Sequence, residues 1–327
     1  MNQASSALDL ASSHLVLGTR PSQLARWQTE LVAAALRRAW PHLHTEVRTY
    51  LTQGDRQLGQ PLPEIGGKGL FTAEIEAALR HGEIDLAVHS FKDLPILQGD
   101  GLVVGAVLER ADARDVLISR HEVVLEALPP APRIGTSSLR RAAQLLAARP
   151  DARIVSLRGN VDTRLRKAAT AGYDAVVLAA AGLSRLGLAG QVTQWLPFEV
   201  MLPAPAQGAL AVQCRADDQA TLALLRPIHH PPTWAAVSAE RAFLAGLGGG
   251  CSAPVAAYAE PTEAGAARLQ LRGLVASPDG RQVVRLAAEG PLSAPDELGQ
   301  QLAQQILARG AQALLEETLN QPPPAMG

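Results

Sequence analysis

Residues 133–180 decide the fold, and they read RIGTSSLRRAAQLLAARPDARIVSLRGNVDTRLRKAATAGYDAVVLAA. Three short apolar runs in this stretch are typical of buried strands, and the two segments between them have helical spacing. The predicted strands are Arg133–Gly135, Ile154–Leu157 and Asp174–Ala180, and the predicted helices are Ser138–Ala148 and Val161–Ala171. Thr136 to Ser138 supply N-cap residues for the first helix. Strands that alternate with helices in this way predict an α/β unit built on a parallel sheet.

The same alternation occurs earlier in the chain. We expect strands at His14–Leu17, Thr45–Leu51, Ile84–His89 and Val116–Ser119, and helices at Ser22–Trp40 and Leu70–His81. Pro41 and Gly82 end the two helices. Two α/β units, joined around Glu109–Arg114 and again near Pro203–Gly208, predict two lobes with a cleft at the carboxyl ends of their strands.

The remainder of the chain has a different pattern. A helix around Trp234–Ala245 is followed by strand-like stretches and a final helix, which together predict a small α+β domain. The stretches are Ala256–Ala259, Leu269–Val275 and Gln282–Ala287, and the final helix is Ala294–Glu317. The predicted domains are a flexible extension at 1–13, domain 1 at 14–109 and 208–226, domain 2 at 110–207, and domain 3 at 227–327.

Composition sets the broad class of protein. The 327 residues are 47% hydrophobic and 19% charged, with a formal net charge of −1, as in an ordinary globular protein that can bury a sizeable core. Residues 1–18 lack a basic start and an apolar block, and no apolar run approaches the roughly 18 residues that span a bilayer. We therefore expect a cytoplasmic protein without a membrane segment.

Several kinds of site can be excluded from the sequence. Gly66–Gly69 lacks the spacing and the Ser or Thr of a nucleotide-binding P-loop, and no dinucleotide, zinc-protease or calcium-loop pattern is present. We expect no metal. Residues 133–167 contain no aromatic side chain on which a nucleic-acid base could stack, so we expect no nucleic acid either.

Positive charge is concentrated in one part of the chain. Residues 133–167 hold eight Arg and one Lys against two Asp. Arg140 and Arg141 lie in the first turn of a predicted helix, where the helix dipole also favours anions. Arg158 and Arg164 follow the next strand, Arg185 follows a third, and in the other lobe Arg20 and Ser22 follow the first strand. The planar guanidinium group of Arg presents N–H donors in a fixed geometry that matches the oxygens of carboxylates and phosphates. The sequence therefore predicts a site for a polyanion.

Asp93 and Lys92 are the candidates for proton and covalent chemistry. Both follow the strand that ends at His89, and so they belong to the predicted cleft. A carboxylate among cations stays ionised, which lets Asp93 stabilise a cationic intermediate or shuttle protons. Lys92 could instead form an imine with a carbonyl substrate, and the sequence leaves that alternative open.

The two cysteines have different surroundings. Two thiols in a chain of this size form neither a disulfide framework nor a zinc site. Cys214 lies in an apolar segment and is interpreted as a small buried hydrophobe. Cys251 follows three glycines, a setting that exposes its side chain and lets other groups approach it. Cys251 is therefore the candidate for covalent attachment.

These residues together resemble the hydroxymethylbilane synthase family, also called porphobilinogen deaminases. The resemblance runs in order from residue 14 to about residue 260. It rests on GTRPS at 18–22, GGKGLF at 66–71, VHSFKDLP at 88–95, GTSSLRR at 135–141, LRGNV at 157–161, LSRLG at 183–187 and GGC at 249–251. Each motif is weak alone, and their order makes the set specific.

The resemblance implies two periplasmic-binding-protein-like lobes around a cleft and a third domain that carries a dipyrromethane cofactor on a Cys251 thioether. It implies a transferase of porphyrin and heme biosynthesis that deaminates four porphobilinogens and condenses them head-to-tail into hydroxymethylbilane, with Asp93 as the catalytic carboxylate. The implied cofactor contacts are Lys68, Lys92, Asp93, Ser138, Arg140 and Arg141, and the implied substrate contacts are Arg20, Ser22, Arg158, Arg164, Arg185 and Gln207. The family usually works as a monomer, and hand-over of the reactive product to uroporphyrinogen-III synthase is a further implied partnership.

The chain departs from the family pattern at two positions, and a rival interpretation also accounts for part of the sequence. Ala206 stands where the family often has glycine, and Phe91 stands where methionine is common. The rival is a non-catalytic, two-lobed anion-binding protein. It explains the arginines and the predicted hinge segments, but it gives no role to Cys251 or Asp93.

Overall fold

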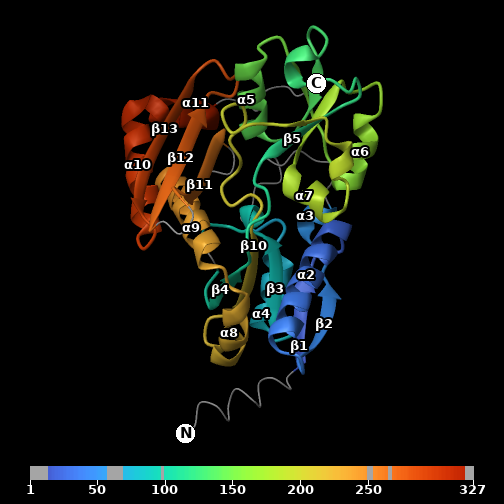
Figure 1. Ribbon diagram of the computed structural model, residues 1–327, viewed down its shortest axis with the longest axis vertical. Helices are drawn as coiled ribbons and strands as arrows, with labels where there is room; N and C mark the ends of the chain where they lie inside the picture. Colours follow the sequence, from blue (N-terminus) through green and yellow to red (C-terminus); the bar gives the residue numbers. More distant parts are fainter. Residues whose placement is uncertain (1–13, 57–68, 97–98, 249–252, 264–266, 321–327) are drawn as a thin grey trace. The chain divides into compact units, whose positions relative to one another are not determined.

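The computed structural model describes residues 14–56, 69–96, 99–248, 253–263 and 267–320 (Figure 1). The chain forms two compact units. One contains most of the residues up to 110 together with 209–234, and the other contains 111–208 together with the residues from 235 onward.

The first unit is built on a mixed five-stranded sheet with the strand order β2-β1-β3-β10-β4. The strands are β1 (His14–Thr19), β2 (His44–Thr49), β3 (Leu86–Ser90), β4 (Leu102–Val107) and β10 (Leu210–Arg215). β1 pairs in parallel with β2 and β3, whereas β10 lies antiparallel between β3 and β4. The carboxyl ends of β1, β2 and β3 therefore lie at the same edge of the sheet.

Alternating side chains bury both faces of this sheet. Leu15 and Leu17 pack with helix α2 (Gln23–Ala39) and helix α8 (Gln219–Leu225), while Val16 between them packs on the other face. That other face is covered by helix α4 (Ala73–Arg80). Three short helical segments complete the unit: α3 (Gln53–Arg56), η1 (Phe91–Asp93) and η4 (Arg226–Ile228).

The second unit repeats the same sheet topology. Its strands are β5 (Asp115–Ser119), β6 (Arg133–Gly135), β7 (Arg153–Val155), β8 (Ala175–Ala179) and β9 (Gln194–Trp195). They are ordered β7-β6-β8-β5-β9, with β6 parallel to β7 and β8, and with β5 antiparallel to β8 and β9. The chain passes from one unit to the other before residue 111 and again before residue 209. The first strand after each passage, β5 or β10, is the one that runs antiparallel to its neighbours in the sheet.

Helices cover both faces of the second sheet (Figure 1). Leu117 and Ile134 pack with helix α5 (Leu139–Ala148) on one face. Val116 and Val176 pack on the opposite face with helices α6 (Val161–Ala168) and α7 (Ala180–Arg185). Two 3-10 turns, η2 (Leu125–Ala127) and η3 (Ala189–Gln191), lie in the connections.

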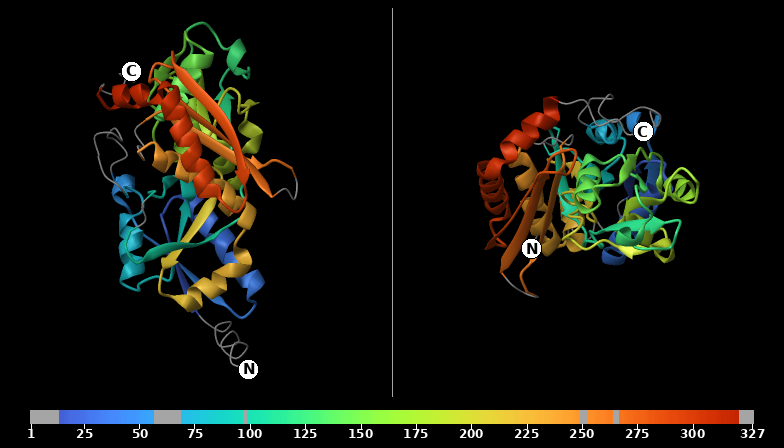
Figure 2. Two further views of the ribbon diagram at one scale, coloured as in Figure 1. Left: turned by 90° about the vertical axis from the view of Figure 1, so that its left-hand side faces the viewer. Right: turned by 90° about the horizontal axis from the view of Figure 1, so that it is seen from above.

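The last part of the chain forms an antiparallel sheet with its own core. The strands are β11 (Val255–Pro261), β12 (Arg268–Ala276) and β13 (Val283–Pro291). Helix α9 (Pro231–Gly246) and helix α10 (Pro295–Ile306) contribute to this core, and Figure 2 shows α10 lying along the sheet. Residues of β11 and β12 also pack with Ala143 of α5, within the second unit.

The structure confirms the predicted fold class, with two α/β lobes and a C-terminal α+β part. Two expectations were wrong. Both large sheets are mixed rather than parallel, because β5 and β10 return in the opposite direction to their neighbours. The final helix is also interrupted, since a π-helical turn at Leu307–Ala311, with Gly310 at φ 97°, precedes helix α11 (Gln312–Asn320). β4 and helix α8 were not predicted at all, and the proposed domain boundaries stay predictions.

Candidate functional site

In the first lobe the predicted site residues follow the strands whose carboxyl ends share one edge. Arg20 comes directly after β1, and Lys92 and Asp93 lie in η1, directly after β3. Ser22 caps α2, since its Oγ accepts a hydrogen bond from the Ala25 N–H at 3.3 Å. The parallel pairing of β1 and β3 brings Arg20 and Asp93, which are 73 positions apart in the chain, to the same edge of the sheet.

A buried anchor holds the turn that carries Asp93. Phe91 is 2% exposed, stacks against Trp234 with ring centroids 6.4 Å apart, and donates its backbone N–H to Ala209 O at 3.0 Å. Lys92 is half-buried, whereas Asp93 is exposed. Within the described part of the chain no group is hydrogen-bonded to the Asp93 carboxylate. This carboxylate is therefore available to a ligand.

The strand that leads to this turn is held by a polar network in the interior. His89 is buried next to the Gln213 side chain, with His89 Nε2 3.2 Å from Gln213 Oε1. Burial lowers the pKa of His89 to about 4, so its imidazole is neutral at pH 7. Ser90, the next residue, exchanges hydrogen bonds with the buried Gln28 side chain at 3.0 and 3.3 Å. His89 thus serves structure rather than proton transfer.

In the second lobe, Arg140 and Arg141 converge on one buried carboxylate. Arg140 Nη1 donates to Asp115 Oδ2 at 2.7 Å, and Arg141 Nη2 donates to Asp115 Oδ1 at 2.7 Å. Asp115 is 0% exposed and each arginine is 6% exposed. Burial alone raises the pKa of the Asp115 carboxyl, but the two guanidinium groups hold that pKa well below its usual range. The Asp115 carboxyl is therefore ionised at neutral pH.

The hydrogen bonds of this cluster leave part of one guanidinium available. Arg141 also donates from Nη1 to Val177 O at 3.1 Å, and Arg140 Nη1 also donates to Leu202 O at 2.7 Å. Among the described residues no acceptor lies on Nε or Nη2 of Arg140. Two cations share one carboxylate here, and so one positive charge in the buried cluster is not balanced within it.

Gln207 and Arg185 join this cluster through the segment that precedes β10. The Gln207 side chain is buried and donates to Asp115 Oδ1 at 2.9 Å and to Ala113 O at 2.8 Å. The next residue, Gly208, accepts a hydrogen bond from Arg185 Nη2 at 2.7 Å. Burial lowers the pKa of Arg185 to about 10, so this guanidinium stays cationic at neutral pH.

Ala206, one of the two residues that depart from the family pattern, lies in the same segment. Its φ is 62°, the left-handed region that favours glycine, and it is fully buried. Its N–H donates at 2.6 Å to Glu240, whose other carboxylate oxygen accepts from Ala259 N at 2.7 Å. The surrounding contacts thus hold an alanine in a conformation that glycine adopts at lower cost.

The segment that carries Ser138 is tied to the one that carries Arg158, since Ser137 Oγ donates to Leu157 O at 3.0 Å, and Arg164 lies in the helix α6 that follows. Ser138 caps α5, since its Oγ accepts from the Arg141 N–H at 3.4 Å, as the sequence predicted. Arg164 Nε donates at 2.8 Å to the carbonyl oxygen of Gly159, a residue whose φ is 115°. Lys167 Nζ donates to the carbonyl of Arg158 at 3.3 Å. Arg158 and Arg164 are both half-buried.

Two predicted contacts lie outside the described residues: Lys68 and Cys251. The other cysteine is as the sequence predicted. Cys214 is buried in the core of the first lobe, and burial raises the pKa of its thiol to about 11, so it is neither exposed nor ionised at pH 7.

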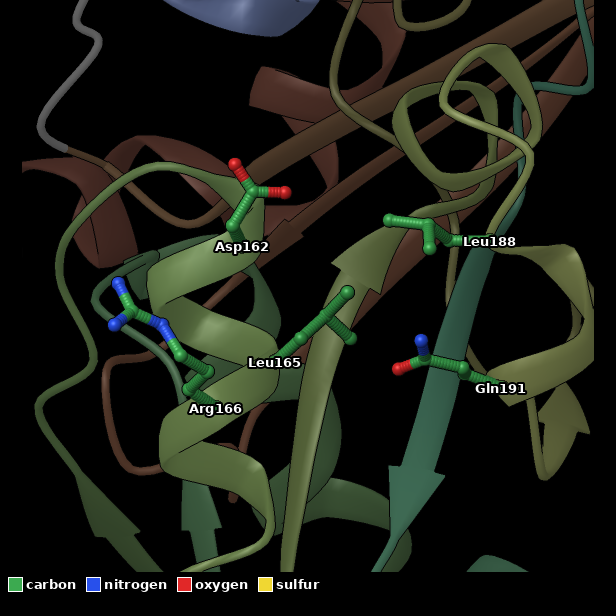
Figure 3. Close-up of a pocket in the computed structure, with 5 residues that line it drawn as sticks. All are labelled: Asp162, Leu165, Arg166, Leu188 and Gln191. Atoms are coloured by element: carbon green, nitrogen blue, oxygen red, sulfur yellow. The ribbon is translucent and has the colours of Figure 1, made fainter.

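One pocket of about 280 Å³ has none of the predicted site residues in its lining. Figure 3 shows that it is formed by Asp162, Leu165 and Arg166 of α6 and by Leu188 and Gln191 from the segment after α7. In the part of the chain that the structure describes, no group of three or more His, Cys, Asp or Glu could hold a metal ion, and no helix is long and apolar enough to cross a membrane.

Two carboxylates of the site were missed by the sequence analysis. Asp115 lies directly before the predicted strand Val116–Ser119 and was given no role, although an acidic residue beside a buried apolar run needs a partner if it is buried too. Asp55, which forms an ion pair with Arg20, lies in α3 after a strand. Nothing in its local sequence distinguishes it from a residue of a solvated turn.

Comparison with known proteins identifies the family to which this chain belongs. Fold and side chains define the class first: a two-lobed α/β protein with arginines gathered at the carboxyl ends of its strands. Residues 15–223 match the family model "Porphobilinogen deaminase, dipyromethane cofactor binding domain", and residues 234–308 match "Porphobilinogen deaminase, C-terminal domain". The chain belongs to the porphobilinogen deaminase family and is accordingly a transferase of tetrapyrrole biosynthesis, with dipyrromethane as the family's cofactor.

Curated relatives agree over nearly the full length. The porphobilinogen deaminase of Brevibacillus brevis is 50% identical over 305 residues, which cover 93% of this chain and 97% of the relative. That of Moorella thermoacetica is 50% identical over 301 residues, covering 92% and 95%. Among solved structures, the Bordetella pertussis BvgS VFT2 domain is 14% identical, with a TM-score of 0.40 over 70% of this chain and 92% of that one. A TM-score of 0.40 is too low to support a conclusion about this chain.

Proposed function

We propose that this chain acts as a hydroxymethylbilane synthase, using the arginines of its lobes to bind the carboxylates of porphobilinogen and of a dipyrromethane group on Cys251. The observation that carries the proposal is the buried cluster of Arg140, Arg141 and Asp115, which holds one more guanidinium than carboxylate. A buried cation is costly unless it is paired. A ligand carboxylate on Arg140 Nε and Nη2 completes the pairing.

The residues present fit a group with several carboxylates. Porphobilinogen bears an acetate and a propionate, and two linked pyrroles bear four such groups. Arg140 and Arg141 would hold the carboxylates of the dipyrromethane, together with Ser138, Lys92 and Lys68. Arg20, Ser22, Arg158, Arg164, Arg185 and Gln207 would hold those of the incoming substrate. When bound, dipyrromethane supplies a pyrrole α-carbon as the nucleophile for condensation.

Asp93 is proposed as the catalytic carboxylate. Its exposed side chain, which has no partner among the described residues, can accept hydrogen bonds from pyrrole N–H groups. As ammonia leaves the substrate, positive charge develops on the pyrrole, and a fixed carboxylate stabilises that charge. After the new carbon–carbon bond forms, the same carboxylate can accept the proton that the ring must lose. The burial of Phe91 fixes the backbone position from which Asp93 acts.

Three further statements stay predictions, the location from the sequence and the other two from the family resemblance. They are that the enzyme is a monomer, that it is cytoplasmic, and that it hands its product over to uroporphyrinogen-III synthase. We propose no role for nucleic acid or membrane, since the arginines that could bind phosphates are assigned to substrate carboxylates.

The deciding experiment is the intact mass of the denatured protein. We expect the wild type to be heavier than its sequence by two linked pyrrole units, and we expect Cys251→Ser to lack this addition. Cys214→Ser is the matched control, because Cys214 is a buried thiol of raised pKa, and this variant should keep the addition. A wild type that stays unmodified after incubation with porphobilinogen would overturn the proposal in favour of a non-catalytic anion-binding protein.

A further inference from the structure

Asp55 and Arg20 lie beside each other because they follow neighbouring parallel strands. β1 and β2 pair from His14 with His44 to Thr19 with Thr49, so that both strands end at the same level. Arg20 comes directly after β1, and Asp55 lies in α3, a few residues after β2. The pairing of the strands thus places a carboxylate next to an arginine that the proposed function assigns to substrate binding.

Asp55 occupies one side of the Arg20 guanidinium. Arg20 Nε donates to Asp55 Oδ2 at 3.1 Å, and Arg20 Nη2 donates to Asp55 Oδ1. Asp55 is itself fixed, because Oδ2 also accepts from Thr52 Oγ1 at 2.7 Å and from Thr52 N at 3.3 Å. With its side chain 9% exposed, Asp55 is a well-buried part of the lobe. A two-point contact of this kind sets both the position and the plane of the guanidinium.

Phe71 supports the same guanidinium from its flat face. The Arg20 Cζ atom lies 4.3 Å from the centroid of the Phe71 ring. The ring in turn lies against Gly54, where a Cβ atom would come within 2.1 Å of Phe71 Cε1. The glycine that precedes Asp55 therefore allows the aromatic ring to lie beneath Arg20, so Arg20 is held at its side and at its face.

The remaining edge of Arg20 is open to a ligand. Asp55 uses Nε and one hydrogen of Nη2, which leaves both hydrogens of Nη1 and the second hydrogen of Nη2. No described residue accepts from these donors, and the Arg20 side chain is 23% exposed. The Nη1 and Nη2 donors of one guanidinium lie in one plane and match the two oxygens of a carboxylate.

We propose that Asp55 is the positioning residue for substrate binding in the first lobe: it holds Arg20 so that the Nη1–Nη2 edge presents a fork to a pyrrole carboxylate of porphobilinogen. The inference rests on the proposed function, since it assumes that Arg20 binds substrate. Asp55 does not contact the reacting atoms and acts only through Arg20.

The test is a double-mutant cycle in the holoenzyme, with Asp55→Asn, Arg20→Gln and the double variant. The carboxylate contact is the same in the ground state and in the transition state, so its loss should raise KM for porphobilinogen more than it lowers kcat. We expect a KM increase of about tenfold for Asp55→Asn and of about tenfold or more for Arg20→Gln. Because Asp55 acts through Arg20, adding Asp55→Asn to Arg20→Gln should change KM by less than about twofold.

Asp218 provides a matched control in the same lobe. It repeats the arrangement of Asp55, since it pairs with Arg215 at 2.9 Å and accepts from Thr221 Oγ1 at 2.8 Å and from Thr221 N at 2.9 Å. Asp218→Asn should lower the melting temperature to an extent comparable with Asp55→Asn and leave KM unchanged. This comparison separates a loss of stability from a loss of substrate orientation.

The outcomes distinguish the inference from the function on which it rests. An unchanged KM in Arg20→Gln would remove Arg20 from substrate binding, and with it the starting point of the inference. A raised KM in Arg20→Gln with an unchanged KM in Asp55→Asn would overturn the positioning role alone. Additive effects of the two substitutions would also overturn it, because they would mean that Asp55 acts independently of Arg20.

Discussion

Arg141 donates two hydrogen bonds to the same oxygen of Asp115, from Nε at 3.2 Å and from Nη2 at 2.7 Å. This contact joins the first residue of β5 to the first turn of α5, and Arg140 uses the other oxygen of the same carboxylate. The arginines that the sequence assigned to ligand binding are thus also part of the interior of the second lobe. The proposed ligand binding and the stability of the lobe therefore involve the same ion pairs.

Removal of the Asp115 charge should destabilise the protein strongly. Asp115→Asn leaves two buried guanidinium groups without their carboxylate, and breaking a buried ion pair in this way costs about 3–5 kcal/mol. Urea denaturation measures the loss. Asp151→Asn is the control, because Asp151 pairs with Arg149 at the surface, where water screens the pair, and the variant should lose far less stability than Asp115→Asn. Equal losses in the two variants would mean that the buried cluster has no special energetic role.

Asp174 should make the second lobe sensitive to acid. Burial alone raises the pKa of this carboxyl, but hydrogen bonds from the Arg133 N–H, His121 and the Arg133 side chain lower it to about 2. A carboxyl whose pKa is lower in the folded state stabilises that state fully above about pH 4, its ordinary range, and this stability is lost as the pH falls toward about 2.

We therefore expect the wild-type melting temperature to fall between about pH 4 and pH 2, and we expect Asp174→Asn to reduce this dependence. At pH 7 the variant should melt below the wild type, because it lacks the ion pairs with Arg120 and Arg133. Calorimetry over this pH range checks both points. Parallel curves for the variant and the wild type would contradict the assignment.

Asp93→Asn should lower turnover while leaving binding intact. A positioned acid or base contributes about 10²–10⁴ to a rate, so kcat should fall within that range while KM and the mass of the attached cofactor stay unchanged. Asp100→Asn is the control, since Asp100 is another exposed carboxylate of the same lobe. Full turnover in Asp93→Asn would remove Asp93 from the mechanism. Trapping of substrate on Lys92 by borohydride would instead favour the imine alternative.

Gly208→Ala should be more costly than a matched glycine substitution. Gly208 has φ 89°, and a Cβ atom there would lie 2.5 Å from the backbone oxygen of Ala111. Gly187, in the same unit, has φ 71° with nothing within 4 Å of such an atom. We expect a loss of about 1 kcal/mol for Gly187→Ala from backbone strain alone, and of about 3 kcal/mol for Gly208→Ala, in which the clash adds to the strain.

The Gly208 substitution has a functional consequence as well. Its carbonyl accepts from Arg185 Nη2 and from the Ala111 N–H, so a shift of this backbone displaces Arg185. KM for porphobilinogen should rise in Gly208→Ala and stay unchanged in Gly187→Ala, as steady-state kinetics would reveal. Denaturation curves that coincide for the two variants would contradict the structural argument.

The sequence by itself determined the alternation of strands and helices, the cap at Ser138, the buried state of Cys214 and the position of Asp93 directly after a strand. These features depend on side chains close together in the chain, where hydrophobic periodicity and capping chemistry can be recognised. The motifs that carry the family resemblance are local in the same sense, and the comparisons confirmed the family.

Only the tertiary structure decided which partners the arginines have. Asp115 lies 25 residues from Arg140, Gln207 lies 92 residues from Asp115, and Asp55 lies 35 residues from Arg20. The direction of β5 and β10, which makes both large sheets mixed, is likewise a matter of how the chain passes between the units. Contacts between distant residues depend on strand order and register, which no local pattern specifies. For that reason the candidate site residues could be named from the sequence, whereas the carboxylates that pair with its arginines could not.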